Sequence, residues 1–273
     1  MSTHLDTILA RTRANVAETK ARVPLAAQKH RAAWHKPRGW ANALRNRAQS
    51  AIAVIAEIKK ASPSRGLIRE DFDAAQLARS YSACGAAALS VLTDGPFFQG
   101  SLKDLKAASD AVALPCLRKD FIVDQYQIVQ ARRWGADAIL LIAAALTNAE
   151  LKWFAEAARE TELDVLVEVH TAEELGRVLD TLGTEGADAI GVNNRDLQTL
   201  EVRLETSFEL IARIPPGVIR VAESGISTPD DLARLRAAGF DAFLIGESLM
   251  RRPDPGQALA TLLAGVEMAR IAE

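Results

Sequence analysis

Cysteine is scarce in this 273-residue chain, which has only Cys84 and Cys116. Their spacing fits neither a metal site nor a secreted disulfide scaffold, so two buried, reduced thiols are expected. Long apolar runs are missing as well: no segment approaches the roughly 20 apolar residues of a membrane span. The N-terminus also lacks the apolar stretch of a secretion signal. The sequence therefore predicts a cytoplasmic protein with no membrane partner.

Histidine is sparse, and several cofactor motifs are absent. The four histidines are scattered, without a pair at helical spacing, and are interpreted as surface or loop residues: His4, His30, His35 and His170. We therefore expect no catalytic metal. The chain has no Gly-x-Gly-x-x-Gly phrase and no Walker A phrase, so a nucleotide cofactor is not expected either.

An excess of one charge is lacking too. The chain has 33 basic and 35 acidic residues, for a net charge of −2, and thus no electrostatic footprint for nucleic acid. Hydrophobic residues make up 49%, enough for a sizeable core. The length fits one α/β barrel of about 250 residues, although it also allows two smaller domains.

Eight short runs of branched apolar residues alternate with longer helical patterns from about residue 48 onward. Continuous apolar runs are typical of strands buried on both faces, and the helices between them indicate parallel pairing. Eight such units predict a closed (β/α)8 TIM barrel. The runs are Ile52–Ile58, Ala87–Leu92, Leu114–Leu117, Ala138–Ile142, Val165–Val169, Ala189–Val192, Val218–Val221 and Ala242–Ile245.

A short phrase also recurs about every fifty residues, each time leading into an apolar strand. Its copies are Gly85-Ala-Ala-Ala, Gly135-Ala-Asp-Ala, Gly186-Ala-Asp-Ala and Gly239-Phe-Asp-Ala. Such a period could indicate propeller blades, but each interval holds two strand-plus-helix units, so the phrase marks every second strand. Glycine there suits the end of the preceding helix.

The two ends of the chain complete a single domain. Residues 1–47 fit no βα unit and are predicted to form an N-terminal helical extension, with Leu5, Ile8, Leu9, Thr12 and Val16 on one stripe. A separate small module is the alternative, but no linker follows the segment. Residues 48–250 form the expected barrel core, and residues 251–273 a C-terminal helix.

Charged and polar residues gather at the predicted strand ends, where barrels of this type place their active sites. An ionised side chain at the end of a buried strand is costly to desolvate unless it is paired or used, so the set favours a polar site. Structural ion pairs are the alternative for each residue alone. The set includes Glu57, Lys59, Lys119, Glu168, Asn193, Arg195, Glu223 and Ser224.

The turns after the last two strands contain glycine, in Ser224-Gly225-Ile226-Ser227 and in Gly246-Glu247-Ser248. Backbone N–H groups in this part of a barrel bind phosphate in many enzymes. Plain conformational turns remain an alternative. Gly246-Glu247-Ser248 is not a nucleophile elbow, because the Gly-x-Ser-x-Gly pattern is incomplete.

Read as phrases, these strand ends resemble the signatures of the indole-3-glycerol-phosphate synthase family over about residues 50 to 250. Seven phrases in the same order are far more specific than one. They are AEIKKASPSRG from Ala56, PFFQGS from Pro96, LRKDFIVDQYQ from Leu117, LVEVHT from Leu166, GVNNRDLQTL from Gly191, AESGI from Ala222 and LIGESLM from Leu244.

The resemblance implies a cofactor-free lyase that acts on a small phosphorylated substrate. In that reaction 1-(2-carboxyphenylamino)-1-deoxyribulose 5-phosphate closes its ring, loses CO2 and water, and becomes indole-3-glycerol phosphate in tryptophan biosynthesis. By the family's pattern, Lys119 is the general acid that protonates the ketone oxygen. Lys59 holds the carboxylate and is a candidate proton donor in the dehydration, while Glu168 takes part in proton transfer during loss of the hydroxyl.

The remaining matched positions bind or orient the substrate. Glu57, Asn193, Arg195 and Glu223 match residues that position substrate groups and the two lysines. The expected phosphate cradle is formed by Ser62, Ser224, Gly225, Gly246 and Ser248, with Glu247, where some members have serine, binding through its main-chain N–H. Phe98, Leu140 and Leu197 match positions around the aromatic ring, with plain core packing as their alternative.

Two other functions are weighed against the lyase. A different phosphate-binding barrel of the pathway, such as phosphoribosylanthranilate isomerase, needs an acid–base pair but not two rim lysines. A non-catalytic phosphosugar-binding barrel needs neither proton donor nor acceptor. A monomer is expected, because no segment stands out as an interface beyond ordinary surface helices, and the segment Lys60 to Ile68 is predicted to be a turn-rich lid.

Overall fold

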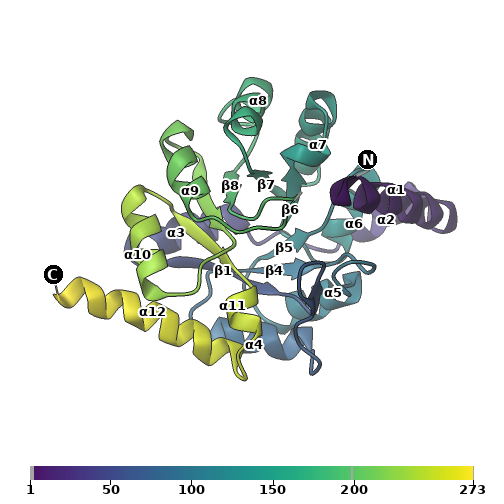
Figure 1. The fold of residues 1–273 in the computed structure, drawn as a ribbon. Coiled ribbons are helices and arrows are strands. Elements are labelled where there is room, and N and C mark those ends of the chain that lie inside the picture. The colour runs from purple at the N-terminus through teal and green to yellow at the C-terminus, as the bar shows by residue number, and fades with distance from the viewer. Residues whose placement is uncertain (1–2, 198, 273) are drawn as a thin grey trace.

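A closed barrel of parallel strands lies at the centre of the molecule (Figure 1). The computed structural model describes residues 3–197 and 199–272, and within them eight strands form the barrel. Each strand pairs in parallel with its neighbours, and the pairing of β10 with β1 closes the barrel. The predicted (β/α)8 TIM barrel is confirmed. The strands are β1 (Ala53–Ile58), β4 (Ala88–Leu92), β5 (Cys116–Lys119), β6 (Ala138–Ile142), β7 (Asp164–Val169), β8 (Ala189–Asn193), β9 (Ile219–Glu223) and β10 (Ala242–Ile245).

Helices form a ring outside the strands (Figure 1). They are α4 (Ala74–Ala83), α5 (Leu102–Ala111), α6 (Gln125–Arg133), α7 (Asn148–Glu160), α8 (Ala172–Leu182), α9 (Glu205–Leu210), α10 (Pro229–Ala238), α11 (Glu247–Met250) and α12 (Pro255–Ala272), with 3-10 turns at Ala143–Ala145 and Ile211–Arg213. Helix α7 is typical: Thr147 caps it in a capping box, and Leu151, Phe154 and Ala158 are its buried stripe.

In three of the four copies of the recurring phrase, an aspartate links the strand that follows it to the strand before it. Asp137 accepts a hydrogen bond from the backbone N–H of Cys116 at 2.7 Å, Asp188 from that of Val165 at 2.8 Å, and Asp241 from that of Arg220 at 2.9 Å. A side-chain acceptor here satisfies a backbone donor at the start of a barrel strand. The aspartates of the recurring phrase thus link neighbouring strands of the barrel.

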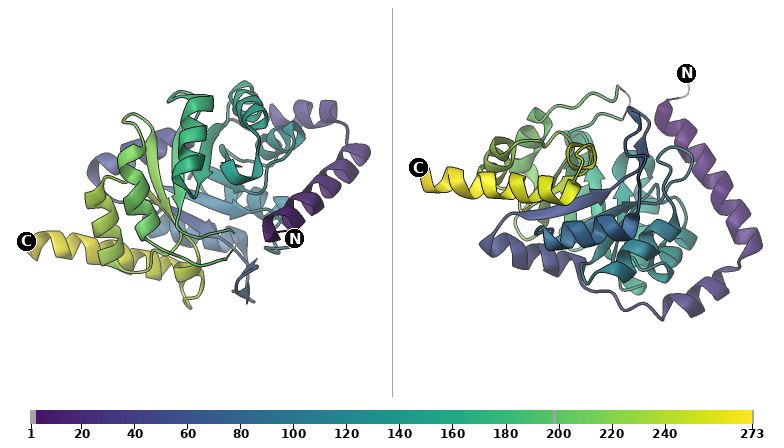
Figure 2. Two further views of the ribbon diagram at one scale, coloured as in Figure 1. Left: turned by 45° about the horizontal axis from the view of Figure 1, so that its top comes forward. Right: turned by 90° about the horizontal axis from the view of Figure 1, so that it is seen from below.

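Three helices precede the barrel: α1 (His4–Arg22), α2 (Leu25–Ala32) and α3 (Trp40–Ser50). Helices α1 and α2 run along one side of the barrel, while α12 extends from the opposite side (Figure 2). Ile8, Thr12 and Val16 are the buried face of α1, as the predicted stripe required.

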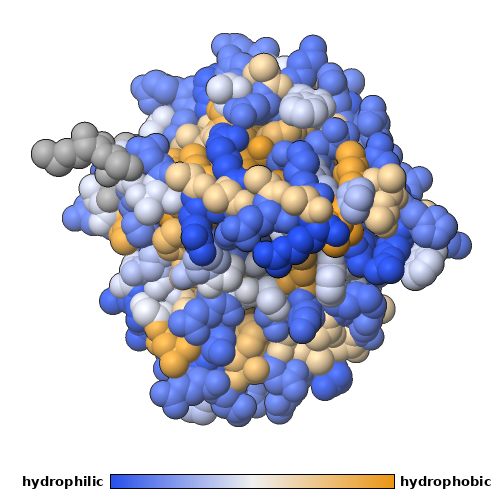
Figure 3. Space-filling model, turned by 90° about the vertical axis from the view of Figure 1, so that its right-hand side faces the viewer, coloured by the Kyte–Doolittle hydropathy of each residue, from blue (hydrophilic) through white to orange (hydrophobic). Residues whose placement is uncertain are grey.

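The side of the molecule seen in Figure 3 is mainly hydrophilic, with apolar residues in small patches.

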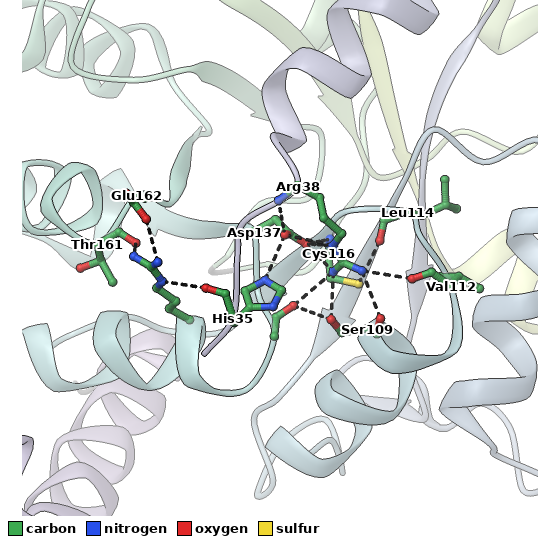
Figure 4. Close-up of polar contacts among 11 residues, drawn as sticks. His35, Arg38, Ser109, Val112, Leu114, Cys116, Asp137, Thr161 and Glu162 are labelled. Carbon is green, nitrogen blue, oxygen red and sulfur yellow. Dashed lines mark hydrogen bonds and ion pairs between the residues drawn. The ribbon is translucent and has the colours of Figure 1, made fainter. Parts of the chain in front are cut away.

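The segment between α2 and α3 is held at the N-terminal end of the barrel by ion pairs (Figure 4). Asp137, fully buried, pairs with Arg38 and lies 3.1 Å from His35 Nε2. The Arg38 guanidinium also donates to the backbone oxygens of Ser109 and Val112, both at 3.1 Å. A charge pair of this kind is stable only because its remaining donors are also satisfied.

Other sequence expectations have mixed outcomes. Both cysteines are free, but only Cys116 is buried, and Cys84 is half-buried at the end of α4. The expected lid segment contains a short antiparallel hairpin, β2 (Ala61–Ser62) and β3 (Gly66–Leu67), consistent with its turn-rich composition. Among the helices described, none is both long and apolar enough to cross a membrane.

Candidate active site

A cavity of about 360 Å³ opens at the C-terminal ends of the barrel strands. The charged residues predicted from the strand ends meet there, because parallel strands in a barrel all end at one rim. The predicted residues that line it are Glu57, Lys59, Phe98, Lys119, Leu140, Glu168, Asn193, Arg195, Leu197, Glu223, Ser224, Gly225, Gly246, Glu247 and Ser248.

Lys119 is the centre of the polar cluster. It ends β5, and its Nζ donates to Glu168 Oε2 at 3.1 Å and to Glu223 Oε2. Glu168 lies at the end of β7 and Glu223 at the end of β9, so three strands place one ammonium between two carboxylates. The side chains of all three are almost completely buried. One ammonium group and two carboxylates are therefore in direct contact at the wall of the cavity.

Burial and charge act in opposite directions on these groups. Burial alone lowers the pKa of Lys119, but the charges of Glu223, Glu168 and Glu57 outweigh it and hold this pKa above the ordinary value. Burial raises the pKa of Glu168, yet Lys119 and His170 together keep it below the usual range. For Glu223, burial and the neighbouring Glu168 prevail over Lys119, and its pKa is raised. In the free site, Lys119 is thus charged and Glu168 ionised.

A second lysine–carboxylate pair lies beside the first. Lys59, just after β1, places its Nζ 2.5 Å from Glu57 Oε1, with both side chains mostly buried. Asn193, at the end of β8, accepts from the backbone N–H of Arg195 at 3.0 Å. This contact fixes the start of the loop that carries Arg195 into the cavity.

The two glycine turns form a backbone cradle at one side of the cavity. Gly225 has φ +82°, a conformation that side chains rarely adopt, and a Cβ there would come within 2.7 Å of Val202. At Gly246 a Cβ would come within 2.2 Å of Glu57 Oε1. Both positions need glycine for close approach, and both glycines line the cavity.

Two serines predicted for this cradle differ in position. Ser248 Oγ donates to the carbonyl oxygen of Ile226 at 2.8 Å, which ties one glycine turn to the other. Ser62 does not line the main cavity. It lines an adjoining cavity of about 90 Å³ together with His4, Leu5 and Ile8 of α1, and with Lys59.

Glu247 is surrounded by three arginines, two of which the sequence reading missed. Its carboxylate lies 3.1 Å from Arg65 Nε, 3.2 Å from Arg195 Nη2 and 3.2 Å from Arg251 Nε. Arg65 belongs to the quoted phrase AEIKKASPSRG and so could have been selected, whereas Arg251 follows LIGESLM and had no signal. Guanidinium groups from three segments therefore converge next to the cradle.

The apolar part of the cavity combines expected and unexpected residues. Phe98, Leu140 and Leu197 line it as predicted, and Phe121 and Ile142 line it without having been selected. Phe121 lies inside the phrase LRKDF, two residues after Lys119, where it could have been found. Phe98 and Phe121 face each other with ring centroids 6.4 Å apart.

His170 is another residue that the sequence reading undervalued. It does lie in a loop, after β7, but its side chain is only 7% exposed. Its Nε2 is 3.3 Å from Glu168 Oε1. Among the residues described, no three or more His, Cys, Asp or Glu side chains are arranged so that they could hold a metal ion.

Fold and site together define a (β/α)8 barrel with a buried lysine–carboxylate cluster in a cavity at the C-terminal ends of its strands. A sequence model of the family described as Indole-3-glycerol phosphate synthase matches residues 5–262. The chain belongs to the indole-3-glycerol phosphate synthase family, which are carboxy-lyases of tryptophan biosynthesis, and the family and function predicted from the sequence motifs are confirmed.

Curated relatives match over nearly the whole chain. The indole-3-glycerol phosphate synthase of Koribacter versatilis (strain Ellin345) is 53% identical over 263 residues, covering 96% of this chain and 100% of the relative. That of Laribacter hongkongensis (strain HLHK9) is 52% identical over 268 residues, with 97% and 100% covered.

Solved structures with low identity support the fold alone. The 3-hexulose-6-phosphate synthase from Salmonella typhimurium has a TM-score of 0.60 at 13% identity, covering 78% of this chain and 99% of that chain. Thiamine phosphate pyrophosphorylase from Pyrococcus furiosus has a TM-score of 0.59 at 16% identity, with 80% and 96% covered.

Proposed function

We propose that the cavity binds 1-(2-carboxyphenylamino)-1-deoxyribulose 5-phosphate and that Lys119, Glu168 and Lys59 carry its ring closure, decarboxylation and dehydration. The observation that carries this proposal is the contact of the buried Lys119 with both Glu168 and Glu223 in the same cavity as a backbone cradle. A single bound molecule can then place its phosphate in the cradle and its ketone at the ammonium.

Lys119 acts in the first step as general acid. The ring carbon that bears the carboxylate attacks the ketone carbon, a C–C bond forms, and the ammonium gives its proton to the ketone oxygen. Loss of CO2 returns the bonding electrons to the ring and restores its aromaticity. A positioned acid of this kind contributes on the order of 10² to 10⁴ in rate.

Dehydration then completes the indole. The hydroxyl leaves as water with a proton from Lys59, and Glu168 takes the proton released when the last double bond of the five-membered ring forms. Glu57 Oε1 lies 2.5 Å from Lys59 Nζ, and this ion pair holds the lysine in place. In the proposed binding mode the substrate carboxylate lies next to the same lysine. A lysine donor and a carboxylate acceptor are thus placed in the same cavity, as this step requires.

The rest of the cavity orients the substrate. Backbone N–H groups of Gly225, Gly246 and Glu247 bind the phosphate, with the guanidinium groups around Glu247 adding positive charge. Phe98, Leu140 and Leu197 pack on the aromatic ring. Ser62 lines the adjoining cavity, which shares Lys59, Phe98 and Arg195 with the main one.

A direct assay tests this function. The purified, metal-free protein is incubated with the substrate, and indole fluorescence is followed without added cofactor. We expect product with the wild type and loss of turnover in Glu168→Gln, because the residual amide accepts no proton. Saturable binding without product would instead favour a non-catalytic phosphosugar-binding barrel.

Removal of the substrate phosphate tests the cradle. We expect the dephosphorylated compound to bind about 10²-fold more weakly or worse, since each hydrogen bond to a charged group contributes roughly 1.5–3 kcal/mol. Isothermal titration measures both affinities. Inorganic phosphate should compete with the substrate but not with the dephosphorylated compound, and equal affinities for the two compounds would rule out this phosphate site.

We also propose that the protein is a cytoplasmic monomer. No segment of the sequence stands out as an interface beyond ordinary surface helices. Light scattering after size-exclusion chromatography tests the oligomeric state, and a mass of twice 29.4 kDa would contradict it.

A further inference from the structure

A chain of charged groups runs from the surface of the barrel to Lys119. Glu174, at the start of α8, accepts from the backbone N–H of His170 at 2.7 Å and lies 3.2 Å from His170 Nδ1. The other ring nitrogen, Nε2, lies 3.3 Å from Glu168 Oε1. Glu168 Oε2 in turn accepts from Lys119 at 3.1 Å. Each carboxylate in the chain therefore has a cation beside it.

The local sequence fixes this arrangement. β7 ends at Val169 and Thr171 caps α8, so His170 is the only residue between the strand and the helix cap. Glu174 comes three residues after the cap, where its N–H donates to Thr171 Oγ1 at 3.2 Å. A carboxylate in the first turn of a helix is favoured by the helix dipole. The contacts of the His170 backbone N–H and of Nδ1 with Glu174 hold the imidazole beside Glu168.

Burial makes the charge of the imidazole significant. The His170 side chain is 7% exposed and that of Glu168 is 3% exposed. Although burial alone lowers the pKa of His170, Glu168 and Glu174 raise it to about 10, so the ring is an imidazolium at neutral pH. The contact of Nε2 with Glu168 is close but lacks hydrogen-bond geometry, since this buried nitrogen has no hydrogen-bond partner among the residues described. It therefore acts through charge and packing.

We propose that His170 is a positioning residue for Glu168: its imidazolium, anchored by Glu174, keeps the Glu168 carboxylate ionised and directed at Lys119 and the substrate. The inference rests on the proposed role of Glu168 as proton acceptor. It has a specific consequence during turnover. When Lys119 gives its proton to the ketone oxygen, it no longer neutralises Glu168, and His170 is the cation that remains.

The other charged groups around this pair are accounted for. Lys119 from β5 and Glu223 from β9 face Glu168, and Glu57 from β1 acts on Lys119. Asn193 from β8 is a neutral hydrogen-bonding neighbour of Glu168. Of these, only Lys119 is a cation, so removal of His170 halves the positive charge at Glu168.

The test is the pH profile of kcat in His170→Gln. Loss of an opposite charge at this distance raises a carboxyl pKa by about one to three units. Glu168 must be ionised to accept a proton, so the acid limb of kcat should move to higher pH by that amount, while KM stays unchanged. A purely structural role would lower stability or raise KM without moving this limb.

His35→Gln is the matched control. His35 also pairs with a buried carboxylate, Asp137, but at the opposite end of the barrel. Its pH profile should superimpose on that of the wild type. If His170→Gln gives the wild-type profile as well, the positioning role is wrong. If the wild type itself forms no product, the proposed function fails first, and the role of His170 in it fails with it.

A measurement on the wild type covers the case in which His170→Gln does not fold. With 15N-labelled histidine, nuclear magnetic resonance follows the four imidazoles as the pH rises. We expect one of them to stay protonated up to about pH 10. Deprotonation of all four below pH 8 would show that His170 carries no charge at working pH and would overturn the proposal.

Discussion

Replacement of Lys119 by Met is expected to lower kcat by about 10² to 10⁴, because the substrate ketone loses its general acid. Methionine matches the length of the lysine stem, so the β5 backbone and the packing of the stem are retained. In the proposed binding mode the substrate phosphate and ring contact other residues, so substrate binding should persist. Single-turnover measurement of indole formation gives the rate of the chemical steps.

The structure adds a second effect of the same substitution. Lys119 is the cation shared by Glu168 and Glu223, and without it two buried carboxylates face each other. One of them will take up a proton, because like charges at this range raise each other's pKa. A moderate loss of stability should therefore accompany the loss of rate, and circular dichroism must show that the variant is folded at the assay temperature.

Lys106→Met is the control for this experiment. Lys106 is an exposed lysine that pairs with Asp110 one turn along α5, and its loss should leave kcat unchanged. Retention of more than about a tenth of the wild-type rate in Lys119→Met would contradict a general-acid role, since that role is worth at least about 10².

The largest effect on stability is expected for Asp137→Asn. This change removes the negative charge that pairs with the Arg38 guanidinium. Removal of one member of a buried ion pair lowers the free energy of unfolding by about 3–5 kcal/mol. His35 and the backbone N–H of Cys116 lose part of the same acceptor. Urea unfolding at neutral pH measures the change.

The pH of that measurement matters. Burial raises the pKa of Asp137, but His35 and Arg38 outweigh it and keep the pKa below the ordinary value. A depressed carboxyl pKa stabilises the fold above the unfolded pKa of about 3.9, and this stabilisation is lost as the pH falls through the folded value. At neutral pH the full contribution is present.

Asp241→Asn is the matched control for Asp137→Asn. Asp241 occupies the same place in the recurring phrase and also accepts from a backbone N–H, but its pair with Arg220 is about one-third exposed. We expect a loss of roughly 1 kcal/mol, typical of one hydrogen bond. Equal losses for the two variants would mean that the Arg38 pair adds nothing beyond the shared backbone contact.

The sequence by itself determined the barrel and the family. Eight apolar runs predicted eight strands because a strand covered on both faces has no polar position, and the recurring phrase predicted where every second strand begins. The strand ends located Lys119, Glu168 and Glu223 at one rim. This worked because parallel strands in a closed barrel can end nowhere else.

Only the tertiary structure decided what these residues contact. The balance of burial against carboxylate charge at Lys119 depends on distances across three strands, which no spacing in the sequence encodes. The same holds for the three arginines around Glu247, for Ser62 in the adjoining cavity and for the Arg38–Asp137 pair. His170 shows most clearly that the sequence does not reveal which groups a side chain contacts. The sequence predicts only a surface or loop histidine there. Its burial between two carboxylates, which the sequence does not show, is what supports the proposed role, because desolvation strengthens the effect of a single charge.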